Sequence, residues 1–222
     1  MRSHSTSTHT NLFIFFLVYS ILIKIVFISG IFPEETINPI MLSIGEELSL
    51  FLNFSVQFSY ALLIFLLHKF IRINDIEKKL FIPLLGWFLL ISLSAIFNTY
   101  NSILNIDMDQ FYIVSRVLGI LILAFEIYTF IIIFLMPLSL YKNYLKKFAW
   151  LMITISIIDI IFPFFLTILD GTKVIDFIHN LKTIFFLLSL LHYIPWLIIL
   201  QMMLKQNHYL TNITISKIDL QK

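Results

Sequence analysis

The sequence predicts an all-α, polytopic membrane helix bundle with six transmembrane helices and with both termini on the cytoplasmic side. Three observations lead to this prediction. Hydrophobic residues make up 59% of the 222 residues, charged residues only 13%, and the mean hydropathy is +0.96. Soluble domains are about half apolar and about a quarter charged. The apolar residues gather in long runs, and the Lys and Arg residues gather between alternate runs.

Six runs are long enough to cross a bilayer, since a helix needs about 20 mostly apolar residues to span a hydrocarbon core of roughly 30 Å. They are 11–32, 48–70, 80–98, 112–136, 148–169 and 183–204. Strands of a membrane barrel would be about half as long and would alternate strictly. We therefore expect one membrane domain over 1–222, ending in a polar cytoplasmic tail at 205–222. The first run is expected to be a retained span, because no small-x-small cleavage site follows it.

The distribution of basic residues predicts the orientation of the bundle. With the N-terminus in the cytoplasm, the outer side carries only Lys173 and Lys182, while Lys24 and Arg116 lie within spans. The inner side carries the other basic residues, which are Arg2, Lys69, Arg72, Lys78, Lys79, Lys142, Lys146, Lys147, Lys205, Lys217 and Lys222. The richness in Ile, Phe, Lys and Asn favours the cytoplasmic membrane of a bacterium.

Composition also narrows the chemistry that we expect. A net charge of +2 is too small for a surface that tracks phosphates, so no nucleic-acid partner is predicted. The absence of cysteine rules out a disulfide framework, a thiol nucleophile and thiolate metal sites. The six histidines show no two-histidine helical spacing, and no intramembrane protease motif is complete. We expect no catalytic residue, no metal site and no cofactor.

Ionisable residues inside a membrane are costly and mark candidate sites. At 1.5 Å of rise per residue, Lys24, Glu126, Asp159 and His192 lie roughly 14 to 21 Å from a span end. Arg116 lies one turn from the outer surface and can extend its side chain to it. Lys24 can pair with only one of the two carboxylates. The pair is then either a structural ion pair or part of a proton-linked site.

Polar and small residues recur at three- and four-residue steps and predict the inward faces of the helices. These faces serve either helix packing or a transport path. Their members are Ser49, Asn53, Gln57 and Tyr60; Trp87, Ile91, Ser94 and Asn98; Ser115, Gly119, Ile122, Glu126, Thr129 and Ile133; Ser156, Asp159 and Pro163; and Ser189, His192 and Trp196.

Short motifs from residue 80 to 215 resemble an uncharacterised bacterial inner-membrane family, domain of unknown function 2569. The stretch Pro83-Leu-Leu-Gly86-Trp87 is similar to that family's Gly-Gly-Trp-Leu start, with Leu85 in place of one glycine. Ala124-Phe125-Glu126 resembles the stretch around the acidic residue in that family's second span. His192-Tyr-Ile-Pro-Trp196 is similar to the family's aromatic-Ile-Pro-Tyr ending. The resemblance implies a four-helix membrane unit without an assigned activity, to which the first two spans are an addition.

The leading functional hypothesis is a non-enzymatic scaffold, sensor or regulatory subunit that acts through partner proteins. Its expected partners are membrane lipids and either another protein subunit or further copies of this chain. The alternative is a small proton-coupled solute transporter or channel, in which Glu126 and Asp159 carry the charge and His192 assists.

Overall fold

A computed structural model of the chain describes the backbone of residues 2–29, 46–104, 108–137, 139, 141–169 and 189–219. It describes side chains over 7–25, 51–100, 110–137, 139, 141–158, 161 and 189–209. Within these ranges the fold is all-helical and contains no strand. The helices are α1 (Arg2–Ser29), α3 (Glu46–Ile73), the 3₁₀ turn η1 (Lys78–Leu80), α4 (Phe81–Leu104), α5 (Met108–Leu135), α6 (Lys142–Leu169) and α8 (Ile194–Asp219).

Four of the described helices are long and apolar enough to cross a membrane. Their apolar segments are Ser7–Ile25, Phe51–Ile73, Lys78–Tyr100 and Gln110–Leu135. Each of these segments overlaps one of the first four predicted spans, and they are the features expected of a membrane protein. The fifth predicted span, 148–169, lies inside α6. The sixth, 183–204, begins outside the described residues and continues into α8.

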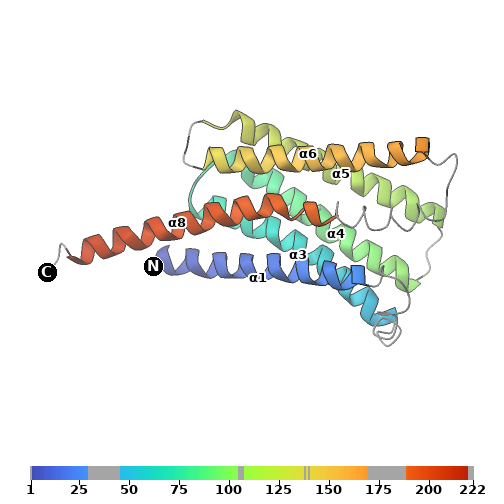
Figure 1. Cartoon of the computed structure of the whole chain (residues 1–222), viewed down its shortest axis with the longest axis horizontal. Helices are drawn as coiled ribbons and strands as arrows, with labels where there is room; N and C mark the ends of the chain where they lie inside the picture. Colours follow the sequence, from blue (N-terminus) through green and yellow to red (C-terminus); the bar gives the residue numbers. More distant parts are fainter. Residues whose placement is uncertain are drawn as a thin grey trace.

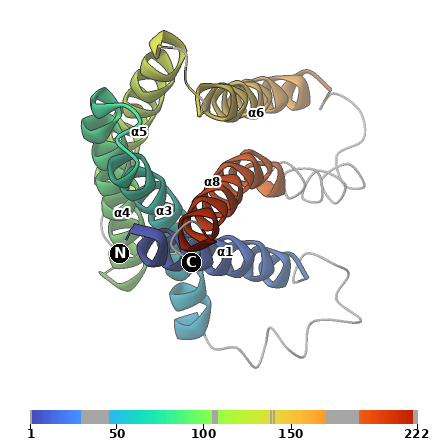
Figure 2. The ribbon, with the colours of Figure 1, turned by 90° about the vertical axis from the view of Figure 1, so that its left-hand side faces the viewer.

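The helices form a ring in which each packs against the next along the chain, and α8 closes the ring against α1 (Figure 2). The start of α1 and the end of α8 lie at the same end of the bundle (Figure 1). Exposed apolar side chains cover the outer surface, with Ile82 at 76%, Ile120 at 68% and Leu135 at 78% exposure. Apolar surface of this extent is what a lipid environment requires.

Aromatic side chains fill the centre of the ring. Trp196 of α8 is fully buried, and its ring centroid lies 6.1 Å from Phe13 of α1, 5.5 Å from Tyr60 of α3 and 5.0 Å from Phe148 of α6. The pairs with Tyr60 and Phe148 are edge-to-face, and such pairs add to the stabilisation that comes from buried area alone. One side chain therefore holds four helices together.

Hydrogen bonds tie α8 to the end of the bundle where the termini lie. The Tyr141 hydroxyl donates to Gln206 Oε1, and Gln206 Nε2 donates to Asn74 Oδ1 over 3.2 Å. Asn207 Nδ2 donates to Thr10 Oγ1 over 2.9 Å. We call Tyr141, Gln206 and Asn74 the terminal clasp. It joins the α3–η1 turn and the α5–α6 connection to α8.

Several helices are longer than the predicted spans. α1 begins at Arg2 rather than near residue 11, and α8 continues to Asp219 through the segment that we predicted as a polar tail. Hydropathy marks the part of a helix that lies in the bilayer, whereas hydrogen bonding decides where the helix itself ends. The terminal clasp supplies such bonds beyond Leu204.

Candidate functional site: a polar cavity within the bundle

A cavity of about 230 Å³ lies between the helices. Its walls come from α1, α3, α4, α5 and residues 189–193, so five segments far apart in the sequence meet there. Most of the lining residues carry polar groups: Lys24, Gln57, Tyr60, Ser94, Ser189, His192 and Tyr193. The remaining lining residues are Val56, Ile91 and Ile122. No acidic side chain is among those that line it in the described part of the chain.

The cavity brings together several of the polar faces predicted from the sequence. Gln57 and Tyr60 come from the face on α3, Ile91 and Ser94 from the face on α4, and Ser189 and His192 from the last one. Residues three or four apart share one side of a helix, so each face contributes a neighbouring pair. The sequence pattern therefore located most of the wall, although it did not indicate that a cavity was present.

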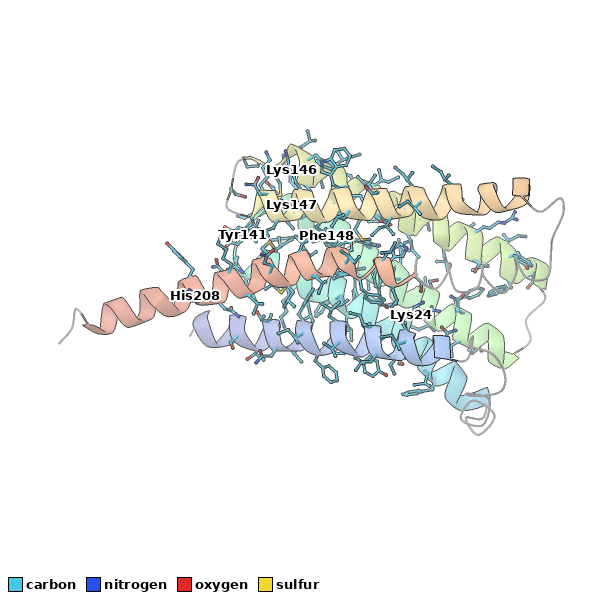
Figure 3. The ribbon with its side chains drawn as sticks, viewed as in Figure 1. Lys24, Tyr141, Lys146, Lys147, Phe148 and His208 are labelled. Atoms are coloured by element: carbon cyan, nitrogen blue, oxygen red, sulfur yellow. The ribbon has the colours of Figure 1, made fainter. Side chains whose placement is uncertain are left out.

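Lys24 and His192, two of the predicted intramembrane residues, both line this cavity. Lys24 extends from α1 in the half of the bundle away from the termini (Figure 3). Its side chain is partly buried, and no ion pair with a described carboxylate is present. An ammonium group in such surroundings carries a large desolvation cost unless something balances its charge.

Glu126 lies elsewhere, in a second cavity of about 190 Å³ between α5 and α6. Ser156 of α6 lies beside its carboxylate, and the rest of the lining is apolar. Glu126 Oε1 is buried and has no hydrogen-bond partner among the described residues. The possible ion pair between Lys24 and Glu126 is thus not formed in this structure, because the two side chains open into different cavities.

The other two predicted site residues are Arg116 and Asp159, and the structure describes the side chain of Arg116 only. Arg116 is exposed on α5, as expected for a side chain that can reach the membrane surface. Asp159 lies in the second half of α6, and its side chain falls outside the described residues. The structure therefore describes no cluster that unites all five predicted residues.

The inward face predicted for α5 holds over only part of its length. Thr129 and Ile133 are buried, whereas Gly119 is exposed, and a methyl group added there would meet nothing within 4 Å. The prediction was wrong for Gly119. α5 and α6 diverge toward the end where α5 begins (Figures 1 and 2), so the small residue faces open space instead of a neighbouring helix.

Hydroxyl contacts between α1 and α3 were not predicted. The Tyr19 hydroxyl donates to Ser55 Oγ over 2.9 Å, and the Ser20 and Ser59 hydroxyls are 2.7 Å apart. Ser20 lies one turn before Lys24, so the pair helps to fix the wall from which Lys24 extends. The available signal was the four-residue step from Ser20 to Lys24, which places both on one side of α1.

Comparisons with known proteins found no match: no protein-family model matches the chain, and no curated protein or solved structure does. The functional argument therefore depends on the geometry of this chain alone.

Proposed function

We propose that the protein is a six-span protein of the bacterial cytoplasmic membrane with both termini in the cytoplasm. The ring of six long helices and the shared end at which the chain starts and finishes support an even number of crossings (Figure 1). Lys146 and Lys147 lie at that same end (Figure 3), as the enrichment of basic residues on the cytoplasmic side predicts.

Single cysteines can test this topology directly, because the chain has no native cysteine. We expect Asn143→Cys to react with a membrane-impermeant maleimide only after cells are permeabilised. Asn101→Cys and Thr172→Cys should react in intact cells. Labelling of all three from the same side, or the reverse pattern, would contradict the proposed orientation.

We further propose that the protein is a non-enzymatic sensor or regulatory subunit that acts through a partner protein. The observation that carries this proposal is the polar cavity, whose walls come from five segments of the ring. A ligand that contacts five segments at once can favour one arrangement of the helices over another. A partner packed against the outer, apolar surface would then sense that change.

The test is purification of the full-length protein from native membranes in mild detergent, followed by mass spectrometry of the co-purifying proteins. A stoichiometric partner, retained at higher detergent concentration, is the expected result. Recovery of the chain alone, or only as copies of itself, would contradict the proposal of a regulatory subunit.

A small proton-coupled transporter is the second candidate, and the buried Glu126 carboxylate favours it. This group lies in an almost apolar cavity, one helical turn from Ile122, which lines the polar cavity. We expect Glu126→Gln and Asp159→Asn to abolish proton-coupled solute flux in proteoliposomes while the protein remains folded. Unchanged flux in both variants would exclude this mechanism.

Membership of the domain of unknown function 2569 family is also a proposal, and it depends on the short sequence motifs alone. The structure describes where the residues of these motifs lie. Gly86 lies directly against the Phe125 ring, while the neighbouring Trp87 packs edge-to-face on Phe130 at 6.1 Å. Trp196 of the last motif is the central aromatic residue of the ring. Residues that resemble the family therefore lie at the helix contacts of this bundle.

A further inference from the structure

We propose that the polar cavity binds a small monovalent anion, such as a halide or a short carboxylate, next to the Lys24 ammonium group. This inference names a ligand class for the proposed sensor and so extends the proposed function. It is argued from the charge, the hydrogen-bond donors and the size of the cavity.

The charge of the lining comes first. Among the described residues that line the cavity, Lys24 is the only lysine or arginine, and none of these residues is acidic. Glu126, the predicted carboxylate whose side chain the structure describes, lines the other cavity with Ser156 beside it, and its charge reaches Tyr60 but forms no ion pair with Lys24. An anion in the polar cavity would supply the balancing charge that the described part of the chain does not.

The neutral groups around Lys24 suit an anion as well. The Tyr60 and Ser94 hydroxyls line the cavity. Ser94 makes no hydrogen bond to another described residue, and the Tyr60 oxygen, which lies beside the Trp196 indole N–H, still has its own O–H to donate. Gln57 Nε2 donates one bond to Asn53 Oδ1, and Gln57 Oε1 accepts one from Asn98, each over 3.3 Å. The amide therefore keeps a second N–H, and its acceptor oxygen is already engaged. Three donors and one cation thus remain for a ligand.

The size of the cavity limits the ligand. A volume of about 230 Å³ lies below the 300 to 1,000 Å³ that is typical of sites for drug-sized molecules. A water molecule occupies roughly 30 Å³ in the liquid, so a small anion fits together with a few waters.

The test uses the purified full-length protein in lipid nanodiscs and thermal unfolding followed by tryptophan fluorescence. Sodium chloride, nitrate and acetate are titrated separately, and the wild type is compared with Lys24→Met, Lys24→Arg and the exposed-lysine control Lys147→Met. A ligand that binds only the folded state raises the midpoint in a saturable way. We expect the wild type to gain about 3 to 6 °C with at least one of these anions.

The variants separate a specific site from a general salt effect. Lys24→Met should lose the saturable rise, while Lys24→Arg and Lys147→Met should keep it. Glu126→Gln should also keep it, with an apparent affinity that is no weaker, because the Glu126 carboxylate lines the other cavity and its charge, which reaches Tyr60, opposes an anion there. Should Lys24→Met fail to fold, Ser94→Val serves instead and should weaken the apparent affinity about tenfold, which corresponds to the loss of one charge-assisted hydrogen bond.

Three results would overturn the inference. One is a wild type with no saturable response to any of the three anions, and another is an equal response in Lys24→Met. The third is an anion response that appears only in Asp159→Asn, because Asp159 would then supply the charge that balances Lys24. Anion binding without any co-purifying partner would uphold this inference and overturn the regulatory proposal, so the two can fail independently.

Discussion

Two glycines on neighbouring helices, Gly86 of α4 and Gly119 of α5, differ in how closely other side chains pack against them. A methyl group on Gly86 of α4 would lie closer than 3.0 Å to three carbon atoms of the Phe125 ring on α5, whereas one on Gly119 would meet no atom within 4 Å. Glycine also lowers the stability of a helix by about 1 kcal/mol relative to alanine. Alanine substitutions at the two positions therefore distinguish the effect of close packing on stability from the effect of helix propensity.

We expect Gly86→Ala to lower the unfolding free energy by about 1 to 3 kcal/mol, since overpacking forces the ring or the helix to shift. Gly119→Ala should be neutral or stabilising by up to about 1 kcal/mol. Thermal unfolding in one detergent gives both values. Phe125→Leu, combined with Gly86→Ala, should recover part of the loss, and equal effects of the two alanines would contradict the described packing.

At the scale of single residues, the sequence predicted which positions are polar inside the membrane but not where each side chain points. Ile122 and Glu126 are one turn apart and were assigned to one face. In the structure Ile122 lines the polar cavity and Glu126 lines the cavity shared with α6. Which side of a helix meets which neighbour depends on the angles at which the helices cross, and a hydropathy pattern contains no crossing angle.

Among the helices, α8 shows how side-chain contacts beyond the apolar run accompany a helix that continues further than its hydropathy predicts. Tyr141 of the terminal clasp packs edge-to-face against Phe70, at 6.1 Å between ring centroids, and donates its hydroxyl proton to Gln206. Burial, and secondarily the nearby Tyr209, raises the pKa of Tyr141 above its usual value near 10. The folded state thus favours the protonated hydroxyl that the clasp needs.

We expect Tyr141→Phe to lower the unfolding free energy at neutral pH by about 0.5 to 1.5 kcal/mol, the value of one hydrogen bond. The raised pKa adds a dependence on pH with a definite sign. Its contribution is fully present below the unfolded pKa near 10 and is lost as the pH rises through the folded value. Between pH 9 and 11 the thermal midpoint of Tyr141→Phe should therefore fall less than that of the wild type.

Tyr128→Phe is the matched control, because Tyr128 is exposed on α5. This variant should follow the wild-type midpoint at every pH. If Tyr141→Phe also did so, the clasp would contribute nothing to stability.

The positions of the helices themselves could be predicted well, because an apolar run of about 20 residues has few alternatives to a membrane helix. The ends could not. The bonds that hold α8 beyond Leu204 join residues 132 and 65 positions apart in the chain, from Gln206 to Asn74 and to Tyr141. Local sequence does not specify such partners.

For the whole molecule, the ring depends on Trp196, whose burial against three helices is not visible in any single run of the sequence. We expect Trp196→Ala to lower the unfolding free energy by about 3 to 5 kcal/mol, as for other large-to-small changes in a core. The adjacent Leu197 is 50% exposed on the outer surface, so Leu197→Ala should cost much less. Denaturation of both variants in the same detergent measures the difference.

The contact between α8 and α1 also has a consequence for how the protein is made. The hydrogen bond from Asn207 to Thr10 joins residues 197 positions apart. During synthesis the N-terminal helices are complete long before α8 emerges, so the polar cavity has no wall from residues 189–193 until the chain is nearly finished. Any chain that stops before residue 189 would therefore leave Lys24 facing an open side of the bundle, and that exposed charge would distinguish it from the finished protein.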